Sequence, residues 1–150
     1  MDTTQINREL IISSDVSEVN IVLLEDKQLV EFHKEQKNSN VSVGDVYLGR
    51  IKKILPGLNA AFVDIGNKKD AFLHYLDLGP QILSLNKYTK LAREGKSAQL
   101  NMDSFELEKS IDKTGKISDF VEAGDLIPVQ IAKEPINTKG PRLTSDISFA

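Results

Sequence analysis

The sequence contains no cysteine and no tryptophan, and its only histidines are His33 and His74. Without cysteine the chain has neither disulfides nor thiolate metal ligands, which agrees with a reducing compartment. Two imidazoles are too few for a histidine-based metal centre. Apolar runs are also short, and none approaches the roughly 20 residues that a membrane-spanning helix needs. The N-terminus lacks a basic region followed by an apolar run, so we expect no signal peptide, no membrane span and a cytoplasmic location.

The common signatures of enzymes are missing as well. The sequence has no glycine-rich phosphate loop with its lysine, no dinucleotide-binding fingerprint and no histidine zinc motif. A Gly-x-Ser-x-Gly nucleophile turn is also absent. Asp64 and Asp70 could pair in principle, but carboxylates at strand ends usually only solvate an edge. We therefore do not expect catalysis by this chain.

The charge is slightly negative, at −3, which counts against a generic nucleic-acid binder. Its distribution is uneven: residues 1–43 hold four Lys/Arg against eight Asp/Glu. Residues 44–79 hold five basic residues against four acids, and these five are Arg50, Lys52, Lys53, Lys68 and Lys69. An anionic partner should therefore meet the central segment, weakly and with a strong dependence on salt.

The first 40 residues predict a small strand and hairpin unit. Residues 5–12 favour a short strand, and 18–24 and 28–33 favour a β-hairpin with its turn at 25–27. The polar run 34–40 has the composition of a linker. We therefore place a domain boundary at residue 40.

Residues 41–150 predict a mainly β fold of five short strands separated by turns such as Pro56-Gly57. The third and fourth strands are joined by a long connection, residues 79–121, in which 84–95 has a helical pattern and 95–116 has none. Five strands with this spacing are the plan of an OB-fold barrel, which commonly binds oligonucleotides. The expected strands are residues 45–55, 58–65, 69–73, 126–133 and 142–147.

Strand parity separates the aromatic side chains from the apolar ones. Ala61 and Val63 share one face of the second strand and Phe62 lies on the other. In the third strand Phe72 and His74 share a face. Phe62 and Phe72 should then lie together on the outer surface, where exposed rings suit base stacking. The alternative is that both are core residues, as strand phenylalanines more often are, and that His74 is a surface or cap residue.

Two lysines, Lys133 and Lys139, flank the last turn, where they suit a phosphate contact or are ordinary solvated charges. A second function class also stays open: a protein–protein interaction or scaffold barrel, with residues 79–124 and the acidic N-terminal hairpin as its partner surface. The surroundings of Phe62 and Phe72 distinguish these two functions. RNA binding predicts that both rings are exposed and surrounded by cations, whereas the interaction barrel predicts that the connection 79–121 buries them.

Several sequence motifs resemble those of the S1 RNA-binding domain, in the form found in the ribonuclease E and ribonuclease G family. The most specific is Ala60-Ala61-Phe62-Val63-Asp64 with Gly66. The resemblance covers residues 44–78 and 122–150 well, and the first 40 residues match more loosely the opening strands of the family's RNase H-like subdomain. The phrases that carry it are residues 44–51, 55–66, 71–74, 129–134 and 139–145.

This resemblance implies single-stranded RNA as the partner. It places the family's stacking aromatics on Phe62 and Phe72, its RNA-contacting lysine on Lys139, and a binding-face histidine on His74, with Lys133 as a further backbone contact. The connection 79–121 is longer than the family pattern.

The resemblance also implies that the chain is an N-terminal fragment of a magnesium-dependent endoribonuclease that acts in RNA processing and decay. The family's magnesium-binding aspartates and zinc-linking cysteines would follow Ala150, so no catalytic residue and no cofactor are expected in the fragment. Whether the full-length parent is a homo-oligomer stays open. If residues 1–40 normally pair with strands outside this chain, their free edges would allow the fragment to dimerise.

Overall fold

The computed structural model describes residues 6–36, 41–96 and 100–149. The chain divides into two compact units, Met1–Asn40 and Val41–Ala150, each with its own β-sheet. Within the described ranges, no helix has the length and apolar character needed to cross a membrane.

The N-terminal unit is an antiparallel sheet with strand order β1-β2-β3. The expected hairpin is present, but its second strand is longer than expected: Lys34 to Gln36 continue the strand instead of starting a linker. Lys34 lies opposite Asn20, and its ammonium group forms a 2.7 Å ion pair with Glu18, so cross-strand pairing extends the sheet. Residue 5 of the expected first strand and residues 37–40 of the expected linker lie outside the described residues. The strands are β1 (Arg8–Ser14), β2 (Glu18–Glu25) and β3 (Gln28–Gln36).

The turn between β2 and β3 consists of two residues in the left-handed region, Asp26 (φ 49°) and Lys27 (φ 65°). This is the backbone of a type I′ turn, which matches the twist of the flanking strands and usually contains glycine. Asp26 ties the turn to the start of β1: its carboxylate accepts a 3.0 Å hydrogen bond from the Asn7 amide, and its own amide donates to the Asn7 carbonyl.

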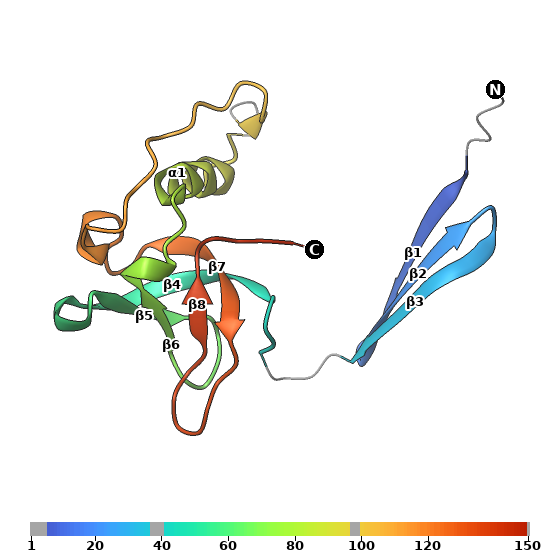
Figure 1. The fold of residues 1–150 in the computed structure, drawn as a ribbon, viewed down its shortest axis with the longest axis horizontal. Helices are drawn as coiled ribbons and strands as arrows, with labels where there is room; N and C mark the ends of the chain where they lie inside the picture. The colour runs from blue at the N-terminus through green and yellow to red at the C-terminus, as the bar shows by residue number, and fades with distance from the viewer. Residues whose placement is uncertain (1–5, 37–40, 97–99, 150) are drawn as a thin grey trace. The chain divides into compact units, whose positions relative to one another are not determined.

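The second unit is a closed barrel with strand order β4-β5-β6-β8-β7 (Figure 1). All neighbouring strands are antiparallel except β6 and β8, which run parallel. The predicted five-stranded OB barrel, with a long connection between its third and fourth strands, is confirmed. The strands are β4 (Val46–Leu55), β5 (Ala60–Asp64), β6 (Ala71–His74), β7 (Leu126–Lys133) and β8 (Arg142–Thr144).

Several strand boundaries differ from the sequence prediction: β4 begins at Val46 and not at 45, β5 ends at Asp64 and not at 65, and β6 is Ala71–His74 and not 69–73. The start of β5 and the end of β8 have a local cause. Residues Pro56–Leu58 form a 3₁₀ turn, η1, and Asn59 adopts φ 48°, so β5 begins at Ala60 and not at 58. At the other end β8 stops at Thr144. The next residue, Ser145, binds the segment after β6 instead. Its amide donates a hydrogen bond to the Asp77 carbonyl, and its hydroxyl accepts one from the Gly79 amide.

The barrel interior is filled by the apolar row that alternation predicted. Val63 of β5, Leu73 of β6 and Val129 of β7 have no exposed surface. Gly49 of β4 faces this core: a Cβ there would lie 2.6 Å from a Val63 methyl, so only glycine lets the strands approach this closely.

The connection from β6 to β7 carries η2 (Tyr75–Asp77), α1 (Ile82–Arg93) and η4 (Ile117–Asp119). The expected helix is present, although it begins and ends two residues earlier than predicted. Figure 1 shows α1 at one end of the barrel and the β7–β8 connection at the other. Tyr75 tethers the later part of the connection, because its hydroxyl donates to the Asp112 carbonyl at 2.6 Å and accepts from the Gly115 amide at 2.9 Å.

Candidate nucleic-acid interface

Phe62 and Phe72 are directly opposite each other on β5 and β6. Their neighbours in sequence, Ala61, Val63 and Leu73, point into the core, so the alternation of the strands turns both rings outward. Phe62 is 37% exposed, and Phe72 is half-buried. The ring centroids are 6.4 Å apart and the ring planes meet at 69°. The two rings therefore form an edge-to-face pair on the outside of the barrel, as parity predicted.

His74 continues this outer row along β6. Its ring centroid lies 6.5 Å from that of Phe72, with the planes tilted by 34°. Its Nδ1 accepts a 3.0 Å hydrogen bond from the Leu76 amide and so caps η2. The neutral imidazole consequently carries its proton on Nε2. His74 is thus both a cap of η2 and a member of the aromatic row.

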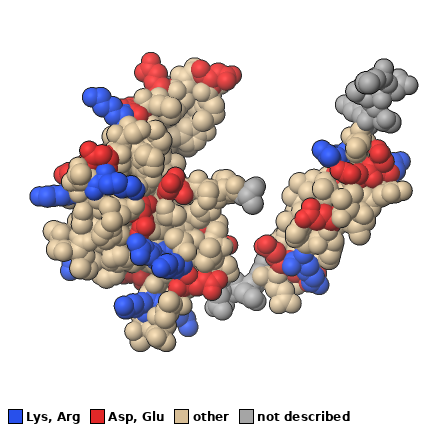
Figure 2. All heavy atoms as spheres, viewed as in Figure 1, with Lys and Arg blue, Asp and Glu red and all other residues tan. Residues whose placement is uncertain are grey.

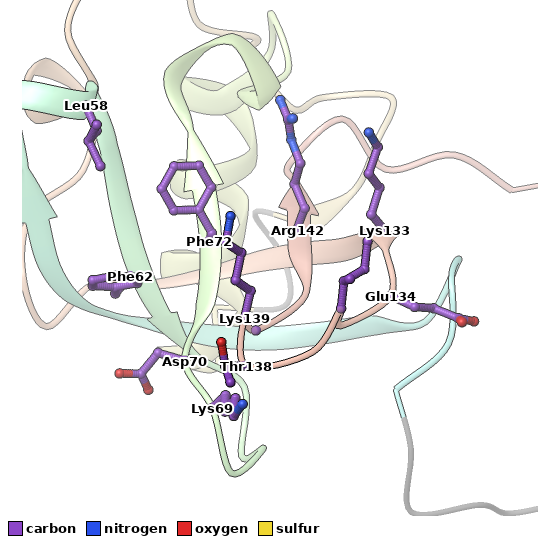
Figure 3. A pocket seen from close by; sticks show the side chains of 12 residues that line it. Leu58, Phe62, Lys69, Asp70, Phe72, Lys133, Glu134, Thr138, Lys139 and Arg142 are labelled. Carbon is purple, nitrogen blue, oxygen red and sulfur yellow. The ribbon is translucent and has the colours of Figure 1, made fainter.

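The aromatic pair lies in an open hollow of about 850 Å³ (Figure 3), which we call the aromatic hollow. It lies between the β5–β6 and β7–β8 connections, and no described residue of 79–121 contributes to its lining. His74 is outside it. The lining residues are Leu58, Phe62, Lys69, Asp70, Phe72, Lys133, Glu134, Ile136, Thr138, Lys139, Gly140 and Arg142.

Four cations line this hollow, and they differ in how far they are already paired. Arg142 is occupied, because its Nε and Nη2 both lie 2.8 Å from one Asp77 carboxylate oxygen. Lys69 donates to the Asn137 carbonyl at 3.3 Å. Lys133 and Lys139 are exposed, and their ammonium groups bind no other residue in the described part of the chain. These two lysines can therefore bind an external anion without losing a partner.

The β7–β8 connection, which carries Lys139, is held against the start of β6. The Phe72 amide donates to the Pro141 carbonyl at 2.9 Å. At Gly140 a Cβ would lie 1.9 Å from the Asp70 carbonyl oxygen, which only glycine can avoid. This close approach fixes Lys139 beside the aromatic pair, and Figure 3 shows Lys139 next to Phe72.

Asp70 lines the hollow and was missed as a site residue by the sequence analysis, which took it for an edge charge. Both of its carboxylate oxygens accept from the Lys52 ammonium group, at 3.0 and 2.9 Å. This hydrogen bond, with the accompanying attraction between opposite charges, raises the pKa of Lys52. Leu58 and Ile136, at 59% and 65% exposure, were also missed, and they add apolar surface at the rim. Ile136 belongs to a turn, where alternation gives no signal, whereas Leu58 shares the parity of Phe62 in the expected strand 58–65.

The face of the molecule that Figure 2 draws is mixed in sign. In Figure 2 lysine and arginine side chains are interspersed with acidic ones and form no continuous basic patch. Among the residues that the structure describes, no group of three or more His, Cys, Asp or Glu side chains could hold a metal ion.

The fold and the hollow define a class: an OB-type barrel that presents an outward aromatic pair beside unpaired lysines. Similar sequences narrow this class. The chain is 37% identical to Ribonuclease G of Haemophilus influenzae and 34% identical to Ribonuclease G of Escherichia coli K12, in each case over 94% of its length. It is 34% identical to Ribonuclease E of Synechocystis over 86% of its length. The chain belongs to the ribonuclease E/G family.

The matched region is a small part of these relatives. It spans about 25% of each Ribonuclease G and 16% of the Synechocystis Ribonuclease E. No protein-family model matches the chain.

Proposed function

We propose that residues 41–150 bind single-stranded RNA as an S1-type domain, within an endoribonuclease of RNA processing and decay. The observation that carries this proposal is the outward pair of Phe62 and Phe72 beside Lys133 and Lys139 in one hollow. The names of the relatives support the choice of RNA, since each is a ribonuclease.

The ring geometry favours single strands over duplexes. Each exposed ring offers a face for one base, and such stacking contributes about 1–3 kcal/mol per base. Because the planes of Phe62 and Phe72 meet at 69°, two bases that stack on them cannot be parallel to each other. A duplex keeps its bases parallel and paired, whereas a single strand can splay them.

The roles of the cations follow from their pairing. Lys139 and Lys133 contact phosphates, because their ammonium groups have no competing partner in the described residues. Arg142 contributes less, since Asp77 already binds it. His74 offers a further ring at the end of the aromatic row, outside the hollow. Binding by so small a site should be micromolar or weaker and should fall steeply with salt.

We assign no catalytic step and no metal to this chain. In the proposal its part in the complete enzyme is to hold the substrate, while magnesium-dependent cleavage belongs to regions of the family that the match does not cover. The interaction-barrel alternative requires the insertion to cover the aromatic pair. In the described ranges the pair is open to solvent instead, so RNA binding is the better-supported function.

The test is a titration of a fluorescent single-stranded RNA at several salt concentrations, with wild type and the Phe62→Ala/Phe72→Ala double variant. Loss of two stacking platforms should weaken binding by about thirtyfold or more. The matched control is Phe32→Ala/Phe149→Ala, which removes two rings that are 54% and 82% exposed and lie outside the hollow. The proposal is wrong if both double variants bind as wild type does while circular dichroism shows them folded.

A further inference from the structure

The connection between β6 and β7 comes back to the barrel at the end of the outer row of β6. Phe72 and His74 belong to this row, and Leu76 follows at the same two-residue spacing and is 51% exposed. The ammonium group of Lys113, from the connection, donates a 3.0 Å hydrogen bond to the Leu76 carbonyl. Figure 1 shows the connection passing from α1 back to the barrel before β7 begins. Lys113 therefore lies where the aromatic row ends.

Two hydrogen bonds to the backbone of Leu76 limit the distance between Lys113 and His74. The Leu76 amide donates to His74 Nδ1 at 3.0 Å, and the Leu76 carbonyl accepts from Lys113 Nζ at 3.0 Å. The amide nitrogen and the carbonyl oxygen of one residue are at most about 3.6 Å apart. Lys113 Nζ is therefore within about 10 Å of His74 Nδ1, the sum of these three separations. The aromatic hollow contains Phe72 and not His74, so this ammonium group lies beyond the hollow.

The backbone around Lys113 is held on the barrel by buried and half-buried side chains. The Tyr75 hydroxyl binds the backbone on both sides of Lys113, as described above. Asn59 adds two hydrogen bonds: its Nδ2 donates to the Gly115 carbonyl at 3.1 Å, and its Oδ1 accepts from the Ile117 amide at 2.8 Å. At Gly115 a Cβ would lie 2.6 Å from the Tyr75 hydroxyl oxygen, so the contact needs glycine. Because this segment is already ordered, a ligand that binds Lys113 does not bear the entropy cost of ordering its backbone.

The charge of Lys113 is not neutralised by a carboxylate within the described residues. Its side chain is exposed and forms no ion pair there, and its one partner is the neutral Leu76 carbonyl. The neighbouring carboxylate of Asp112 binds the amide and the hydroxyl of Thr114, at 2.8 and 2.7 Å, instead of Lys113. An ammonium group has three N–H donors, and Leu76 uses one of them. Two donors and the positive charge are thus available to an external anion.

We propose that Lys113 is a further RNA-contacting residue, which binds a phosphate of a single strand that runs from the aromatic hollow past His74 and Leu76. This inference rests on the proposed RNA-binding function. On OB barrels, cations contact the backbone of a single strand while exposed rings contact its bases, over about 4–16 nucleotides. The row from Phe72 to Leu76 supplies the exposed surface, and Lys113 supplies the cation at its end. The connection between β6 and β7 therefore lengthens the RNA site beyond the hollow.

The experiment titrates fluorescent rU12, a single-stranded oligonucleotide, with the full chain at pH 7.5 and several salt concentrations. Lys113→Gln removes the charge, but its amide can still donate to the Leu76 carbonyl, so the tether of the connection is kept. This variant should bind about threefold to tenfold more weakly than wild type, and its slope of log affinity against log salt should be smaller by about 0.7. Lys113→Arg keeps both the charge and the donors and should bind within about twofold of wild type.

Lys90→Gln is the matched control, because Lys90 is an exposed lysine of α1 that lies near Gly124 and Leu126, away from the end of β6. It removes the same charge and should leave both the affinity and the salt slope unchanged. If Lys113→Gln binds as wild type does, or if Lys90→Gln loses as much affinity, the inference is overturned while the proposed function stands. If wild type does not bind rU12, or if Phe62→Ala/Phe72→Ala binds it as wild type does, the proposed function fails as well.

Discussion

The barrel and the N-terminal sheet differ greatly in how far they bury the apolar residues of their strands. In the barrel the inward row of every strand is covered by the other strands, and Val63 and Leu73 have no exposed surface. In the sheet none of residues 6–36 is buried. Leu10 on one face and Phe32 on the other are 63% and 54% exposed. Neighbouring strands are hydrogen-bonded in both units, so hydrogen bonding alone does not make a core.

Apolar residues on both faces are the pattern of a sheet that is covered on both sides. The barrel unit therefore has its own source of stability, whereas the sheet has pairing and turn geometry only. Three measurements compare the two units.

The largest effect should come from matched leucine truncations in the two units. Leu73→Ala empties a site in the barrel core and should lower the free energy of unfolding by about 2–5 kcal/mol. Leu10→Ala, at 63% exposure, should change it by less than about 0.5 kcal/mol. Urea unfolding is followed by tyrosine fluorescence for the barrel, since all three tyrosines lie within 41–150, and by far-UV circular dichroism for the whole chain. Equal losses in the two variants would contradict the contrast.

A smaller effect is expected from removing one lysine in each unit. Lys139→Ala should weaken RNA binding about threefold to tenfold and reduce the slope of log affinity against log salt by about 0.7, as expected for one lost phosphate contact to a single strand. Lys27→Gly removes a charge from the sheet and should leave both quantities unchanged. The measurement is the same salt-series titration. If Lys27→Gly lost affinity and Lys139→Ala did not, the RNA-binding surface would lie on the N-terminal unit.

The smallest effect concerns the turn of the sheet. Lys27 has φ 65°, which costs a non-glycine residue about 1 kcal/mol, while glycine adds about 0.5 kcal/mol of lost chain entropy. Lys27→Gly should therefore stabilise the hairpin by about 0.5 kcal/mol and slow hydrogen exchange of the β2 and β3 amides about twofold. The barrel amides should not respond, and a matching change there would show that the two units are coupled.

The sequence predicted best where a physical rule has a fixed period. Alternation in β5 and β6 predicted the outward position of Phe62 and Phe72, and the spacing of strands predicted the barrel. Strand boundaries could not be predicted where the conformation or a contact of one residue decides where the strand begins or ends. Asn59 in a left-handed conformation shortens β5, and a Lys34–Glu18 ion pair lengthens β3. The Lys52–Asp70 pair joins residues on different elements, and only the register of a folded barrel brings them together.

The barrel closes through its weakest connection, the parallel contact of β6 and β8, which consists of the single register pair Phe72 and Arg142. Both residues line the aromatic hollow, so a ligand that touches both spans the seam at which the barrel would open. A ligand that needed both residues would stabilise the closed form, by about 2.7 kcal/mol at a hundred times its dissociation constant. Occupancy of the hollow would then be linked to closure of the barrel, and the ligand would raise the melting temperature of the barrel.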